Sequence, residues 1–82
     1  MYTTYILYSS TTGRFYTGQC VDLKIRLAQH NSGRNKSSKD GKPWTIVYVA
    51  ESDSRSEAVR LEEKIKSRGA KRFLKDLNII VG

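Results

Sequence analysis

Four polar or aromatic side chains fall at spacings that could gather them into one reactive site. Tyr5 and Tyr16 lie on two segments that are expected to pair as antiparallel strands, which could bring the two rings close together. Arg26 and His30 are four residues apart on an expected helix and therefore share one side of it. Each feature also has an ordinary explanation, because tyrosine is common on strands and most charged helix residues are solvated.

Gly18 and Glu62 add two less expected features. A glycine inside a strand weakens it, and usually marks a bulge or a close approach of another group to the backbone. Glu62 follows Leu61 and lies one turn after Ala58, at the border of an apolar stripe. We expect Glu62 to point inward and the neighbouring Glu63 to be exposed, although most glutamates on such helices are solvated.

The length and composition limit the class of protein. The chain has 82 residues, which predicts one domain over residues 1–82 with a small core. The single cysteine, Cys20, excludes an internal disulfide framework and a zinc site built from several cysteines. No apolar run is long enough to span a membrane, and the first ten residues lack the features of a signal peptide. We therefore expect a cytoplasmic protein, or one associated with the nucleoid or the nucleus, with no membrane partner.

The charge distribution favours a polyanionic partner. Fifteen Lys and Arg against eight Asp and Glu give a formal net charge of +7. Residues 24–42 carry six basic side chains and one acidic side chain. Residues 60–75 carry seven basic and two acidic side chains. Such a domain attracts nucleic acid, but a solubilising basic surface would have the same composition. Charge alone leaves both interpretations open.

The sequence pattern predicts a hairpin at the N-terminus. Strands are expected at Thr3–Tyr8 and Phe15–Val21, around the turn sequence "SSTTGR". On the first strand, one face should carry Thr3, Tyr5 and Leu7, and the other Tyr2, Thr4, Ile6 and Tyr8. On the second, Tyr16, Gly18 and Cys20 should share a face.

The sequence after the hairpin predicts three helices and a third strand. Asp22 should cap a helix that runs to about His30, and a basic loop spans Asn31–Pro43. The nearly continuous apolar run Trp44–Glu51 is expected as a central strand that is covered on both faces. Ser54 and Glu57 have capping-box spacing and should open a second helix, which ends at Gly69 before a short third helix. The order β-β-α-β-α-α predicts a small α/β domain with a three-stranded sheet flanked by helices.

Taken in order, these motifs resemble those of the GIY-YIG nuclease family over nearly the whole chain. "TTY" at Thr3–Tyr5 corresponds to the first tyrosine motif of the family, with two threonines in place of Gly-Ile. "YTG" at Tyr16–Gly18 corresponds to the second, with Thr17 in place of Ile. "LKIRLAQHN" supplies the Arg and the His-Asn pair, and "LEEKIKSRGAKRF" supplies the Glu. "GKPWTIVYVAE" resembles the third-strand segment of the small stand-alone members. The chain is also similar to the N-terminal catalytic domain of the UvrC excinuclease.

The resemblance implies a metal-dependent endonuclease that hydrolyses phosphodiester bonds. Glu62 would hold one divalent cation, Mg²⁺ or Mn²⁺, and Arg26 would clamp a nonbridging phosphate oxygen. Tyr5 would accept the proton of the attacking water, with its pKa lowered by nearby positive charge. Tyr16 and His30 would orient the water or the phosphate, and either could instead be the general base. We expect these five side chains to converge on one concave, accessible surface beside the sheet.

Nucleic acid is the expected partner, DNA in preference to RNA, in structure-directed cleavage linked to repair or recombination. Gly18 would let the substrate approach closely, and non-specific phosphate contacts would come from Lys24, Lys36, Lys39, Lys42 and Lys66. A protein partner for targeting is a further expectation, while the oligomeric state and the role of Asn78 stay open. Two alternatives remain: a nucleic-acid-binding module that kept the fold with little or no catalysis, and a structural or interaction domain.

Overall fold

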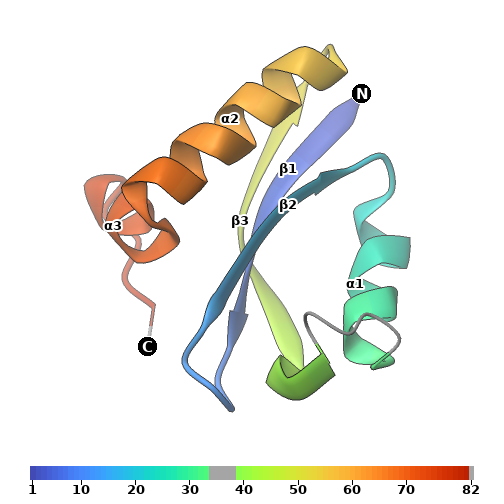
Figure 1. Ribbon diagram of the computed structural model, residues 1–82, viewed down its shortest axis with the longest axis vertical. Coiled ribbons are helices and arrows are strands. Elements are labelled where there is room, and N and C mark those ends of the chain that lie inside the picture. Colours follow the sequence, from blue (N-terminus) through green and yellow to red (C-terminus); the bar gives the residue numbers. More distant parts are fainter. Residues whose placement is uncertain (34–38, 82) are drawn as a thin grey trace.

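The chain forms a three-stranded antiparallel sheet with one helix on one face and two helices on the other (Figure 1). The structure is a computed structural model, and it describes residues 1–33 and 39–81. The elements in chain order are β1 (Tyr2–Ser9), β2 (Phe15–Cys20), α1 (Leu23–Asn31), a 3-10 turn η1 (Lys39–Gly41), β3 (Trp44–Ser52), α2 (Arg55–Arg68) and α3 (Ala70–Asp76). The expected α/β class and the order β-β-α-β-α-α are confirmed. Lys36, one of the expected phosphate contacts, lies outside the described residues.

The sheet order corrects one prediction. The strands are arranged β2-β1-β3, so β1 is the central strand and β3 is at an edge. The expectation that Trp44–Glu51 lies in the middle of the sheet was wrong. Because the hairpin pairs β2 with one edge of β1, β3 pairs with the other edge. Ile46 and Val49 on β3 keep 40% and 46% of their surface exposed, so this apolar run is not covered on both faces.

Alternation along β1 divides the core into two clusters, one on each face of the sheet. Tyr5 and Leu7 pack with Cys20 and Trp44 on the side of α1. Ile6 packs on the other side with Ile65 of α2 and Leu74 of α3. The predicted face pattern of β1 is therefore confirmed, and it decides which side chains can meet those of α1.

The helix boundaries follow the predicted caps. The side chain of Asp22 accepts a hydrogen bond from the Ile25 amide at 3.2 Å, and Ser54 accepts one from the Glu57 amide at 3.2 Å. Gly69, with φ 92°, separates α2 from α3 in a backbone conformation that favours glycine. Asn78 has φ 61°, a left-handed conformation that asparagine tolerates, just beyond the end of α3. Asn78 therefore has a structural role, because its left-handed backbone conformation ends the helical path after α3.

No helix in the described ranges, 1–33 and 39–81, has the length and apolar character needed to cross a bilayer.

Candidate active site

The centre of the candidate site is the ring of Tyr5, which lies across Gly18 of the neighbouring strand. The two residues are cross-strand partners in the β1–β2 ladder. A Cβ added to Gly18 would lie 2.7 Å from the Tyr5 hydroxyl oxygen and 2.9 Å from Cζ. Both distances are shorter than the contacts that Cβ atoms make in proteins. Gly18 was expected to admit the substrate backbone. The structure instead fills that space with the Tyr5 ring, so the glycine is what allows the tyrosine to lie there.

The Tyr5 hydroxyl meets His30 of α1. The distance from Tyr5 Oη to His30 Nε2 is 3.2 Å, within hydrogen-bond range, and the residues are 2% and 0% exposed. Burial and the charge of Arg26 both lower the pKa of His30, which keeps the imidazole neutral near pH 7. A neutral imidazole that carries its proton on Nδ1 has a lone pair on Nε2, so it can accept the hydrogen bond of the phenol.

The pKa of Tyr5 departs from the prediction. The pKa is raised, first by burial and then by Tyr16, Cys20 and Glu62, and only Arg26 acts in the opposite direction. The expectation of a lowered pKa was wrong, because the loss of hydration outweighs the one favourable cation. Tyr5 is therefore a protonated phenol at neutral pH, and it is not a phenolate base in the free protein.

Tyr16 completes a group that we call the tyrosine–histidine cluster, consisting of Tyr5, Tyr16 and His30. The ring centroids of Tyr16 and His30 are 4.6 Å apart with an interplanar angle of 61°. The ring of Trp44, at the start of β3, also contacts Tyr16, with 6.1 Å between the two ring centroids. Tyr16 is half-buried whereas Tyr5 and His30 are buried, so the cluster reaches the surface through Tyr16.

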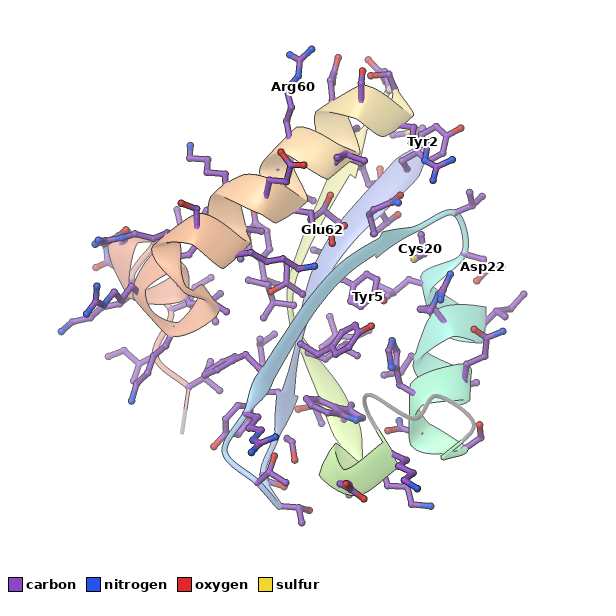
Figure 2. The ribbon with its side chains drawn as sticks, in the orientation of Figure 1. Tyr2, Tyr5, Cys20, Asp22, Arg60 and Glu62 are labelled. Atoms are coloured by element: carbon purple, nitrogen blue, oxygen red, sulfur yellow. The ribbon has the colours of Figure 1, made fainter. Side chains whose placement is uncertain are left out.

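The two charged residues of the site approach the cluster from different helices. Arg26 lies one turn before His30 on α1, is exposed, and acts electrostatically on both His30 and Tyr5. Glu62 lies on α2, which packs on the opposite face of the sheet, yet its charge contributes to the raised pKa of Tyr5. Figure 2 shows Glu62 directed from α2 toward the strands. The expectation that the five side chains converge on one accessible surface was wrong in part. Tyr5 and His30 are buried on the α1 side of the sheet, whereas Glu62 comes from the helix that packs on the opposite face.

Glu62 is the half-buried glutamate of the pair, and Glu63 is exposed, as expected. Its carboxylate forms an ion pair with Lys66 one turn later, with 2.7 Å between Oε2 and Nζ. Lys66 was expected to contact phosphate, but here it contacts the residue that was expected to hold the metal. The side chain of Glu62 keeps 21% of its surface exposed, so an ion could still reach it.

The residues present fit one kind of metal site only. Among the described residues, no group of three or more His, Cys, Asp or Glu side chains could enclose an ion. Mg²⁺ is commonly bound by one or two carboxylates together with water and substrate phosphate. A single half-buried carboxylate such as Glu62 suits that arrangement, and it does not suit a site built from protein ligands alone.

The other described lysines of the predicted nucleic-acid contacts are all exposed. Lys24 is exposed on α1, Lys39 is exposed in η1, and Lys42 is exposed just before β3. The three residues lie on three separate segments between the start of α1 and the start of β3. Their exposure is compatible with non-specific contacts to phosphate.

Asn31 has a structural role that the sequence did not reveal. Its side chain accepts a hydrogen bond from the Trp44 amide at 2.6 Å and donates one to the Trp44 carbonyl at 3.3 Å. The two bonds fix the end of α1 to the start of β3, directly beside His30. The His-Asn pair in the sequence was the available signal, but only the fold shows that the asparagine holds the backbone in place.

Comparisons with known proteins identify the relatives of this chain. The chain matches the GIY-YIG catalytic domain family over residues 1–76. It is 40% identical over 65 residues to a UPF0213 protein of Halobacterium salinarum, covering 76% of this chain and 84% of the relative. It is 38% identical over 61 residues to a UPF0213 protein of Yersinia pestis, covering 73% of this chain and 64% of that longer protein. The solution structure of the UPF0213 protein BH0048 from Bacillus halodurans has a TM-score of 0.58 and 31% identity, covering 96% of this chain and 87% of that one.

Proposed function

Because this chain belongs to the GIY-YIG family, we propose that it is a metal-dependent endonuclease that hydrolyses phosphodiester bonds in nucleic acid. The observation that supports this most is the Tyr5–His30 pair, which is buried beside Tyr16 and within the electrostatic influence of Arg26. This arrangement brings together a proton acceptor, a polar hydroxyl and a cation, which are the groups that phosphodiester hydrolysis requires.

The proton of the attacking water would move through the tyrosine. Since the pKa of Tyr5 is raised, its phenol has to give up its own proton as it takes one from water. His30 Nε2, at 3.2 Å, is positioned to accept that proton, and the neutral imidazole is the form that can do so. In this proposal Tyr5 contacts the water, while His30 acts through Tyr5 and does not itself touch the substrate.

The other three site residues would bind and orient the phosphate and help to neutralise its negative charge. The exposed guanidinium of Arg26 would bind a nonbridging phosphate oxygen with its planar donors. The half-exposed ring of Tyr16 would orient the phosphate or the water. Glu62 would hold a divalent cation, Mg²⁺ or Mn²⁺, that supplies charge neutralisation at the phosphoryl and leaving oxygens when it is bound. The ion pair with Lys66 would have to open or rearrange for Glu62 to do this.

The substrate would be DNA in preference to RNA, and cleavage would be directed by nucleic-acid structure in repair or recombination. A net charge of +7 supports a polyanionic substrate, but it carries no preference for sequence. We therefore also propose that target choice comes from the shape of the substrate or from a protein partner, and that the protein works in the cytoplasm.

The decisive test compares Glu62→Gln with Glu63→Gln on labelled branched, flapped, nicked and single-stranded substrates with Mg²⁺ or Mn²⁺. The first change removes the charge that would hold the cation and keeps the side-chain shape, so cleavage should be abolished while binding persists. Glu63 is exposed and one position further along α2, so its variant should cut like the parent. Equal cleavage by both variants would remove Glu62 from the mechanism.

A nucleic-acid-binding module is the second candidate function. It is favoured by the burial of Tyr5 and His30, at 2% and 0% exposure, and by the engagement of Glu62 with Lys66. A parent protein that binds the substrate panel and cuts none of it would establish this alternative over the nuclease.

A further inference from the structure

A basic groove opens between the β2 edge strand and the junction of α2 with α3. Its cavity has a volume of about 810 Å³. One wall is formed by Phe15, Tyr16 and Thr17 of β2, and the other carries four basic side chains: Lys66, Arg68, Lys71 and Arg72. Basic side chains on a convex helix surface are usually just solvated, but here they line a hollow, where the fields of like charges reinforce one another.

A second cavity continues the groove along α3. Its volume is about 510 Å³, and it is lined by Arg68, Arg72, Lys75 and Asp76. Because Arg68 and Arg72 line both cavities, the two form one continuous surface. We call the five basic residues along it the basic track: Lys66, Arg68, Lys71, Arg72 and Lys75.

Part of this charge is not neutralised within the protein. Lys66 pairs with Glu62, and Arg68 makes a two-pronged contact with Asp76 at 2.9 and 3.0 Å. In the part of the chain that the structure describes, Lys71, Arg72 and Lys75 form no ion pair. Three of the five cations of the track therefore have no ion-pair partner among the described residues.

The groove also adjoins the candidate active site. Tyr16 lines the cavity and meets the His30 ring edge to face, while Lys66 lines the same cavity and pairs with the carboxylate of Glu62. A strand whose phosphate lies at the tyrosine–histidine cluster would therefore have its neighbouring phosphates beside the groove.

We propose that the basic track binds the sugar–phosphate backbone of the nucleic-acid strand next to the phosphate that is cut. This proposal rests on the proposed function, and it moves the main phosphate contacts from the lysines of residues 24–42 to the α2–α3 junction. Every charged side chain of the lining is Lys or Arg except Asp76. Such cations suit phosphate oxygens, and contacts to phosphate carry no base sequence information.

The test measures binding of a labelled DNA flap in the presence of a chelator, so that no cleavage occurs. Lys71→Gln combined with Arg72→Gln removes two free cations from the track. If each contacts one phosphate, the affinity should fall about tenfold or more at moderate salt. The slope of log affinity against log salt should become shallower by about 1.8 for a duplex contact.

The matched control is Arg60→Gln combined with Lys64→Gln, which removes the same charge from α2 outside the groove. Both residues are exposed, and Figure 2 shows Arg60 directed away from the sheet. This pair should change the affinity much less than the track pair does. An equal loss in both pairs would show a general charge effect and overturn the track. Circular dichroism of both variants establishes that they are folded.

Two further outcomes separate this inference from the nuclease proposal. If the parent binds and the track pair loses binding, but no substrate is ever cut, the track stands and the nuclease proposal fails. If the parent cuts and the track pair has an unchanged KM and salt slope, the track fails and the nuclease stands. Should the track be correct and the enzyme active, the track pair will raise KM with little change in kcat, because its contacts are made equally in the ground and transition states.

Discussion

The hydroxyl of Tyr5 and Nε2 of His30 lie 3.2 Å apart in the interior, and this contact connects the central strand to α1. Tyr5 and His30 are both buried, so the hydrogen bond between them stands in place of one that water would supply at the surface. The same contact would carry the proton in the proposed reaction. Stability and activity are therefore expected to change together when it is altered.

Tyr5→Phe tests this coupling by removing one oxygen atom. The loss leaves a buried imidazole nitrogen without its phenol partner, which should lower the free energy of unfolding by about 1–3 kcal/mol. Cleavage should fall at least about 100-fold if the phenol transfers the proton. Urea unfolding and a cleavage assay measure the two effects. Tyr8→Phe is the matched control, because Tyr8 is on the same strand and its ring packs on Phe15 at 5.0 Å. A Tyr5 variant that cuts as fast as the Tyr8 variant would exclude the relay.

The lowered pKa of His30 predicts an acid-sensitive fold. In the unfolded chain His30 takes up a proton near pH 6.5, whereas the folded protein resists protonation down to a lower pH. Between these two values the unfolded state binds more protons, so stability falls as the pH falls below about 6.5. The slope for one proton is at most about 1.4 kcal/mol per pH unit. Arg26 is the cation that adds to this resistance.

Thermal unfolding of the parent and of His30→Gln between about pH 5 and pH 7.5 checks this expectation. Glutamine can still hydrogen bond to Tyr5 but does not titrate, so the variant's stability should be nearly flat where the parent's declines. Parallel curves for the two proteins would show that His30 is not the titrating group in this window.

Much of the fold could be predicted from local patterns, because caps, turn residues and strand alternation act over a few neighbouring residues. Asp22, Ser54 and Gly69 end or begin helices where their chemistry predicts. The position of β3 could not be predicted in this way. An apolar run such as that around Ile46 and Val49 suits an edge strand as well as a central one, and the order depends on which edge of β1 is free.

The candidate site shows the same division. The residue types of Tyr5, His30 and Glu62 could be picked out from their spacing, and the inward direction of Glu62 follows from the apolar stripe. The direction of the Tyr5 pKa shift could not, since it depends on how much burial outweighs the charge of Arg26. The function of Gly18 also needed the strand register, which places it under the Tyr5 ring.

Gly18→Ala should therefore act through Tyr5. The added methyl group would lie 2.7 Å from the hydroxyl oxygen, so the ring must move and the contact with His30 must lengthen. Overpacking of this kind costs about 1–3 kcal/mol. In a Tyr5→Phe background the part of the cost that comes from disturbing the hydrogen bond should be absent, while Cζ, 2.9 Å from the added carbon, still has to move.

A double-mutant cycle by urea unfolding gives this coupling directly. A Gly18→Ala cost that is the same with Tyr5 and with Phe at position 5 would mean that the added methyl group does not act through the hydrogen bond between Tyr5 and His30. The cost would then come from crowding of the ring or from the strand backbone.

The ion pair between Lys66 and Glu62 predicts a dependence on metal concentration. With Nζ 2.7 Å from Oε2, the ammonium occupies the carboxylate that would hold the cation. Lys66→Gln frees that carboxylate, and an exposed pair four residues apart on a helix contributes about 0.3–0.5 kcal/mol. The Mg²⁺ concentration that gives half-maximal cleavage should therefore fall about twofold, measured at saturating substrate so that the lost phosphate contact in the groove does not enter.

Lys64→Gln is the matched control, because it removes the same charge from an exposed position on the same helix without contacting Glu62. A half-maximal Mg²⁺ concentration that rises in the Lys66 variant would mean that the lysine assists the site, by holding either Glu62 or the phosphate in place, and that the two cations do not compete for the carboxylate.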